Sequence, residues 1–226
     1  MSVARTDGAS VVLRPIARDV AAALRDGATP AGVAFADGYP TQFSLEVMDL
    51  LCGPRASDGG ARFEPCFVVR REDGAVVGEI GYGFDAASAT AQLGYAIVEP
   101  CWGRGYATDA LRALVAHLRA DPHVRRITAQ TLVGHGASRR VMEKAGMRLC
   151  DERLGEVDGE LVELVVYEVG EAYAADVAPA ARDVRAAGRR SWVGGYAPRG
   201  CVLRPGRCMP SNSRGSSISA ATPTST

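Results

Sequence analysis

The sequence has few of the patterns that build metal centres, disulfide frameworks or membrane spans. Its six cysteines include no CxxC pair, and none of its three histidines lies at metal-ligand spacing from another ligand. We therefore expect scattered reduced thiols and no metal. No apolar run reaches about 18 residues, the length that a membrane helix needs. Segment 1–10 lacks a basic stretch followed by an apolar core, so we expect no signal peptide, no membrane partner and a cytoplasmic location.

The chain as a whole also lacks net charge. It carries 26 basic and 26 acidic side chains, so a nucleic-acid partner is not expected. Lys144 is the only lysine, which we interpret as coding bias. The last part of the chain carries an excess of arginine over acid, with arginines at positions 182, 185, 189, 190, 199, 204, 207 and 214 against acids at 171, 176 and 183.

This last part, 171–226, differs from the rest in composition. It is rich in Ala, Arg, Gly, Pro and Ser and shows no apolar periodicity, so the sequence predicts a disordered tail. A basic arm that binds RNA or the ribosome is the alternative. Residues 1–170 are predicted to form one globular domain.

The domain begins with one strand and two helices. Val11–Pro15 has the pattern of a strand that proline ends, and 17–25 has a helical pattern. A second helix is predicted at 44–51, with Ser44 as its N-cap.

The middle of the domain carries β-rich runs. Those at 67–70 and 75–84 flank Asp73-Gly74, and Asp-Gly between two such runs is a strong hairpin signal. A third run at 91–98 follows a small turn. We therefore expect an antiparallel meander.

Helical periodicity replaces the β pattern from about residue 105 to 119. The later elements predicted are a strand at 126–132, a helix at 138–145 closed by Gly146, and a hairpin at 147–154 and 161–169. A helix joins the strands at 91–98 and 126–132, so these are expected to be parallel neighbours. The predicted fold is α/β (α+β), with a mixed, mostly antiparallel sheet of about six to seven strands and helices on both faces.

The junction between the strand at 93–98 and the helix near 105 carries Gly103 and Gly105. A helix N-terminus offers unpaired N–H groups and the positive end of the dipole, and glycine lets an anion approach the main chain. The segment lacks a GxGxxG pattern and follows an antiparallel meander, so a dinucleotide fold is disfavoured. Taken alone, the junction predicts an anion site.

Two longer segments resemble the GNAT acetyltransferase superfamily, in particular its branch of ribosomal-protein N-terminal acetyltransferases. The first joins Leu93-Gly94-Tyr95 to WGRGYATDAL at 102–111, and the second is ASRRVMEKAGM at 137–147. The two signatures stand in the family's order, and the resemblance extends from Val11 to Val169. It implies an N-acyltransferase that uses acetyl-CoA as co-substrate.

The resemblance also implies a set of coenzyme-binding residues, in which main-chain amides hold the pyrophosphate. The set is Ile97, Val98, Trp102, Gly103, Arg104, Gly105, Tyr106, Ala107, Thr108, His135, Ser138 and Arg139. Trp102 stands where the family usually has Gln or Arg, and His135 where it usually has Asn. A neutral imidazole keeps one donor and one acceptor and could replace that amide.

The resemblance further implies direct transfer from thioester to amine, with Glu79 as base and Ser138 as donor to the departing thiolate. Glu99 and Glu156 are alternative bases, and Tyr95 and Tyr106 alternative donors. Glu79 could instead be an ordinary solvated strand residue. Ser138 could instead be a helix N-cap. A backbone amide near Val98 is expected to stabilise the carbonyl oxygen.

Several alternatives stay open at this point. The acceptor is an amine, either a small molecule or a protein N-terminus. The donor could be another thioester such as succinyl-CoA, or the chain could be a catalytically silent acyl-CoA sensor. Dimerisation is common in the branch, so a homodimer is one expectation.

Overall fold

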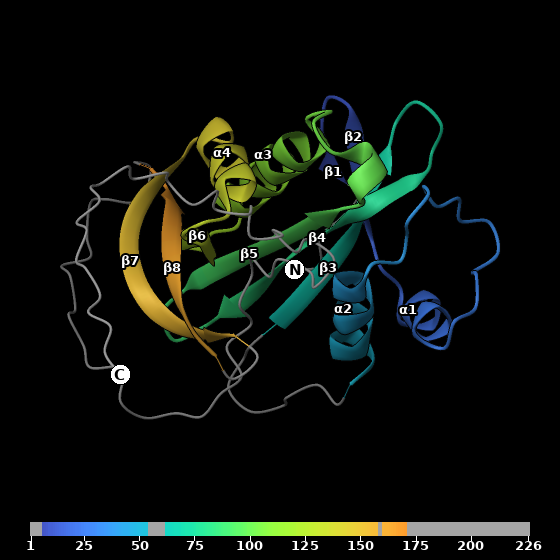
Figure 1. Cartoon of the computed structure of the whole chain (residues 1–226), viewed down its shortest axis with the longest axis horizontal. Helices are drawn as coiled ribbons and strands as arrows, with labels where there is room; N and C mark the ends of the chain where they lie inside the picture. The colour runs from blue at the N-terminus through green and yellow to red at the C-terminus, as the bar shows by residue number, and fades with distance from the viewer. Residues whose placement is uncertain (1–5, 54–61, 158–159, 171–226) are drawn as a thin grey trace, which may run out of the picture.

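The computed structural model describes residues 6–53, 62–157 and 160–170 (Figure 1). Its elements in chain order are β1 (Thr6–Asp7), β2 (Val11–Pro15), α1 (Arg18–Arg25), α2 (Gln42–Cys52), β3 (Arg62–Arg70), β4 (Val76–Asp85), β5 (Thr90–Ile97), the 3₁₀ turn η1 (Glu99–Cys101), α3 (Tyr106–Arg119), β6 (Arg126–Leu132), α4 (Gly136–Lys144), β7 (Met147–Val157) and β8 (Glu160–Val169). The predicted tail, 171–226, lies outside the described residues.

The strands form one eight-stranded sheet in the order β1-β2-β3-β4-β5-β6-β8-β7. Only the β5–β6 pair is parallel, which confirms the crossover expected from the helix between them. The mixed, mostly antiparallel sheet is confirmed. It has one strand more than expected, because the two-residue strand β1 is too short to show a period in the sequence.

Helices cover both faces of the sheet (Figure 1). Alternation along β2 shows how the sequence builds this: Val11 and Leu13 pack with α3 and α4, whereas Val12 packs with α1 and α2. In α3, Leu111, Leu114 and Leu118 are all buried. Burying a leucine side chain contributes roughly 1.5–3 kcal/mol, so this stripe fixes α3 firmly on the sheet.

The start of α2 differs from the prediction. Thr41 is the N-cap, because its hydroxyl accepts from Ser44 N, and the Ser44 hydroxyl accepts in turn from Thr41 N. This reciprocal pair is a capping box. Ser44 is therefore the third helical residue, fully buried, and the prediction of Ser44 as N-cap is wrong.

The start of α4 also differs. The helix begins at Gly136, with His135 in the N-cap position, so Ser138 lies inside the first turn and is not the cap. Its end is as predicted, since Gly146 adopts a positive φ of 87° after the last turn. Among the described residues, no helix is long and apolar enough to cross a membrane.

Candidate active site

The turn between β5 and α3 presents main-chain amides to a ligand. Gly103 and Gly105 have φ values of 75° and 85°, a region that costs other residues about 1–2 kcal/mol. No atom lies within 4 Å of a Cβ built on either glycine, so conformation, and not space, requires them. The first helical bond runs from Asp109 N to Gly105 O, so the amides of residues 106–108 precede the ladder and are available to an anion.

The sheet opens beside this turn. Parallel pairing of β5 with β6 covers only Thr90–Leu93 and Arg126–Ala129, although β5 continues to Ile97. Because Val98 N donates to Val77 O at 2.9 Å, main-chain groups of even-numbered residues face β4, and those of Tyr95 and Ile97 face the opening. Within the described residues, this open edge, next to the amide turn, thus has no strand partner.

This geometry narrows one expectation, that a backbone amide near Val98 stabilises the carbonyl oxygen. The amide of Val98 itself already donates within the sheet. The amide of Ile97 faces the opening instead. The pairing of β5 with a pantetheine arm remains a prediction, now centred on Tyr95 and Ile97.

Trp102 contacts this same edge. Its indole Nε1 donates to Ile97 O at 2.5 Å, while about half of the residue is exposed. An indole N–H is a donor only, so Trp102 satisfies an edge carbonyl that would otherwise face the opening. This contact was not predicted from the sequence.

On the α4 side, three predicted residues have defined partners. The Tyr95 hydroxyl lies 2.9 Å from Ser138 Oγ and donates to Ser138 O at 3.1 Å. Burial raises the pKa of Tyr95 to about 12, so its hydroxyl stays protonated. His135 Nδ1 lies 3.1 Å from Thr131 Oγ1, and burial lowers the pKa of His135, which favours the neutral ring. Arg139 donates to the Tyr167 hydroxyl and to the carbonyl of residue 133.

On the opposite face of the sheet, Glu79 is buried, with 1 % of its surface exposed. Its two carboxylate oxygens accept from the Ser44 hydroxyl at 3.0 and 3.1 Å. Burial raises the pKa of Glu79 to about 8, and the nearby hydroxyls of Ser44 and Tyr39 oppose that rise. The interpretation of Glu79 as a solvated strand residue is therefore wrong.

The two alternative bases lie elsewhere. Glu99 is exposed in η1, and Glu156 is exposed near the end of β7. Neither residue takes part in the hydrogen bonds of Glu79, whose carboxylate accepts from Ser44. Of the three predicted bases, Glu79 is thus the one that is buried.

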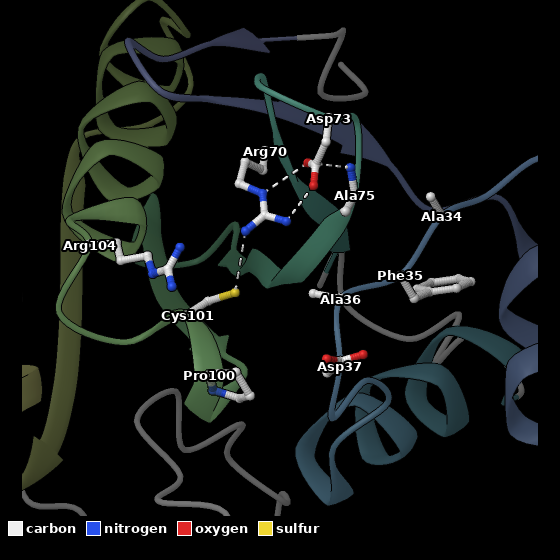
Figure 2. A pocket seen from close by; sticks show the side chains of 10 residues that line it. All are labelled: Ala34, Phe35, Ala36, Asp37, Arg70, Asp73, Ala75, Pro100, Cys101 and Arg104. Carbon is white, nitrogen blue, oxygen red and sulfur yellow. Dashed lines mark hydrogen bonds and ion pairs between the residues drawn. The ribbon is translucent and has the colours of Figure 1, made fainter.

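A pocket of about 430 Å³ lies where the segment 34–37 faces the loop after β5 (Figure 2). Arg70 binds both oxygens of Asp73 and lies 4.0 Å from Cys101 Sγ, and Arg104 reaches toward the same space. The lining carries two guanidiniums and, with Asp37, two carboxylates. The Arg104 side chain therefore lines this pocket, and its predicted role in coenzyme binding depends on its amide.

One further set of contacts holds the start of α3 in place. The carboxylate of Asp109 accepts from the amides of Ala9, Ser10 and Val11 and from the Ser10 hydroxyl, at 2.5–3.2 Å. Burial alone would raise the pKa of Asp109, but these hydrogen bonds lower it overall. Sequence reasoning missed Asp109, because its partners are about a hundred positions away. No group of His, Cys, Asp or Glu in the described segments could hold a metal ion.

An amide turn before a helix, an open strand edge beside it and a buried carboxylate on the next strand agree with an acyl-coenzyme A-dependent transferase, the class that the family match shows. The model of the acetyltransferase (GNAT) domain family matches residues 10–148, more than half of the chain. The chain belongs to this family, and is an N-acetyltransferase with acetyl-CoA as co-substrate.

Solved structures support the fold. An acetyltransferase of the GNAT family from Bacillus anthracis is 15 % identical, with a TM-score of 0.53, over 74 % of this chain and 98 % of that one. A ribosomal L7/L12 alpha-N-protein acetyltransferase in complex with coenzyme A is 16 % identical, with a TM-score of 0.52, over 71 % and 93 %. A microcin C7 self-immunity acetyltransferase with acetyl-CoA and AMP is 15 % identical, with a TM-score of 0.53, over 71 % and 92 %. No curated protein matches the sequence.

Proposed function

We propose that the enzyme transfers the acetyl group of acetyl-CoA directly to a primary α-amine, of a small molecule or a protein N-terminus. The observation that carries this proposal is the register of β4 and β5. Glu79 is paired with Ala96, and the next residue, Ile97, faces the open edge. A buried base thus lies one strand away from the edge that would pair with the coenzyme arm.

The residues around the opening suit that chemistry. Amides of residues 103–108 would hold the pyrophosphate, and acetyl-CoA would supply an activated carbonyl with a thiolate leaving group. The Ile97 amide would donate to the developing oxyanion. Ser138 and Tyr95, joined by a 2.9 Å hydrogen bond, would donate a proton to the departing thiolate. Arg139 and His135 line the α4 side of the same opening in this proposal.

The raised pKa of Glu79 favours an α-amine over a lysine side chain. Glu79, with a pKa of about 8, can exchange a proton with an α-ammonium of pKa about 7.7–8.0 at little cost. A lysine ammonium has a pKa of about 10.4, so the same transfer is uphill by about 3 kcal/mol. The similarity to an enzyme that acts on a ribosomal protein's α-amine supports including N-terminal peptides among the substrates.

The test is a screen of amino acids, polyamines, peptides with free N-termini and peptides with only a free lysine, followed by thiol release from acetyl-CoA. We expect release with α-amines. Glu79→Gln should lower turnover by about 100-fold or more while leaving acetyl-CoA affinity unchanged. Glu99→Gln and Glu156→Gln are matched controls that should keep full turnover.

Other outcomes would overturn the proposal. Acetyl-CoA binding without thiol release from any amine would identify a silent sensor. Release from succinyl-CoA alone would identify a different donor. An unchanged rate in Glu79→Gln with a true substrate would remove Glu79 from the mechanism.

A further inference from the structure

Tyr39 carries a buried hydroxyl that no interaction explains. Among the described residues, it is the side-chain oxygen that is buried and lacks a hydrogen-bond partner. The Tyr39 hydroxyl lies close enough to Glu79 to lower the pKa of that carboxyl, yet it forms no well-aligned hydrogen bond with Glu79 or Ser44. Buried polar groups are nearly always paired, so an unpaired one next to a buried carboxylate calls for a functional reason.

The ring of Tyr39 is held firmly. It stacks on Phe35 with ring centroids 4.9 Å apart and meets the edge of Phe67 at 6.2 Å. It packs against both hydrophobic clusters, one on each face of the sheet. An unpaired hydroxyl on a fixed ring is pre-positioned for a partner that is bound only during the reaction.

The segment around Tyr39 lies against the residues that follow β5. A Cβ built on Gly38 would lie 3.7 Å from Pro100 Cδ and 4.0 Å from Val98 Cβ. Tyr39 N donates to Ala36 O, and Ala36 N donates to Val76 O at the start of β4. Residues 36–39 therefore adjoin β4, which carries Glu79, and the end of β5.

The hydroxyls on the other side of Glu79 form a closed chain. Ser44 Oγ accepts from Thr41 N at 2.9 Å and lies 2.9 Å from Thr41 Oγ1. When Glu79 is ionised, Ser44 directs its only proton to that carboxylate, so Thr41 must be the donor to Ser44. Both acceptor sites of Ser44 are then filled. The chain from Thr41 through Ser44 to Glu79 therefore donates inward, and its outer end, Thr41 Oγ1, accepts from Ser44 N within the capping box.

We propose that the Tyr39 hydroxyl relays the proton of the acceptor amine to Glu79. This inference rests on the proposed function and names a second residue for it. As the amine nitrogen bonds to the acetyl carbon, its proton passes to Tyr39 Oη, while the Tyr39 proton passes to Glu79. The C–S bond breaks, and the thiolate is protonated from the Ser138 side. After the product leaves, Glu79 returns its proton to Tyr39 Oη as the Tyr39 proton passes to a solvent water, and the Ser138–Tyr95 pair regains a proton from solvent, so tyrosine is neutral before and after each turnover.

The environment keeps Tyr39 in its neutral form. Burial, and then the charge of Glu79, raises the pKa of Tyr39 far above its ordinary value. A neutral hydroxyl can donate and accept at once, which a relay requires and a tyrosinate cannot do.

The test compares Tyr39→Phe with two matched variants, using acetyl-CoA and acceptor amines of graded pKa. Tyr39→Phe removes only the unpaired hydroxyl and should lower kcat by about 100-fold for amines of high pKa and by only a few-fold for α-amines of low pKa. Affinity for acetyl-CoA should not change. Phe35→Leu removes the stacking and keeps the hydroxyl, so any loss should be equal for all amines.

Ser44→Ala deletes a hydroxyl on the closed side. It should displace the pH profile upward, because the Ser44 hydrogen bond lowers the pKa of Glu79, without a dependence on amine pKa. In a double-mutant cycle, Tyr39→Phe should add little to Glu79→Gln, since both act on one proton transfer.

Full kcat in a folded Tyr39→Phe variant, or an equal loss for every amine, would overturn the relay. Thermal melts identify a variant that has simply unfolded, and Tyr39→Trp, which also lacks the hydroxyl but fills the site, then replaces it. A wild-type enzyme that acetylates no amine would overturn the proposed function itself, which is a different result.

Discussion

The two sides of the site are built from different parts of the chain. The proposed coenzyme side uses main-chain groups of contiguous residues, 103–108, and the adjacent edge of β5. The acceptor side uses the side chains of Tyr39, Ser44 and Glu79, and Ser44 and Glu79 are 35 positions apart. The first side depends on backbone conformation and the second on side-chain chemistry.

This difference determines which substitutions each side tolerates. A backbone site should accept unusual side chains, such as Trp102, provided that the φ angles are kept. A side-chain site changes with a single atom, because each hydroxyl has a fixed number of donors and acceptors. Variants that change conformation should therefore affect coenzyme affinity, and isosteric variants should affect turnover.

The largest effect is expected from Gly105→Glu. It forces a positive φ on a non-glycine residue and places a carboxylate at the amide turn, so acetyl-CoA affinity should fall by about 100-fold or more by calorimetry. Gly27→Glu is the matched control, because Gly27 also has a positive φ and open space at its Cβ. It should cost similar stability and leave affinity unchanged. Intact affinity in Gly105→Glu would refute the amide turn.

A second effect concerns stability and pH. The pKa of Glu79 is about 8 in the fold against 4.5 as a free group, so the folded state holds a proton that the unfolded state releases. Wild-type stability should therefore fall between about pH 4.5 and pH 8, by up to about 1.4 kcal/mol per pH unit. Glu79→Gln has no such proton and should lose this dependence in urea denaturation. Parallel curves for both proteins would contradict the buried carboxylate.

A third, smaller effect is expected from Asp109→Asn. Amide and hydroxyl donors converge on this carboxylate, so its loss should lower the free energy of unfolding by about 1.5–3 kcal/mol and weaken acetyl-CoA binding a few-fold. The pKa of Asp109 is depressed, so the loss should be largest at neutral pH and shrink as pH falls through that pKa. Asp85→Asn, which breaks only local turn bonds, should cost less.

The smallest effect is expected from Trp102→Phe. The indole donates to Ile97 O, the carbonyl that a pantetheine amide would use, so coenzyme binding should displace it and change tryptophan fluorescence. Affinity should change by only a few-fold. The signal should vanish in Trp102→Phe and persist in Trp192→Phe, which removes the other tryptophan. A persistent signal in Trp102→Phe would show that the indole does not move.

Much of the fold was predictable because its signals are local. Asp73-Gly74 fixed the β3–β4 hairpin, and helical spacing after Gly105 predicted α3 and hence the parallel β5–β6 pair. The errors are at element ends. Ser44 and Ser138 are typical capping residues, but a cap is defined by backbone geometry, which composition does not specify.

The site was predictable only where it is contiguous. The amide turn follows from two glycines at one junction, whereas the burial of Glu79 depends on α2 packing over β4. A strand residue with a carboxylate looks solvated when its neighbours in space are unknown. The capping box was hard to recognise, because Ser44 stands at the third helical position where the signature has Glu or Gln.

The open edge of β5 also links the stability of the folded protein to the binding of acetyl-CoA. A sheet that stops pairing at Leu93 is complete only when a ligand supplies the missing hydrogen bonds. Any ligand that binds only the folded state adds stability, about 2.7 kcal/mol at a concentration 100 times its Kd. Proteases act on the opened chain, so the amount of this enzyme in a cell should rise and fall with the supply of acetyl-CoA.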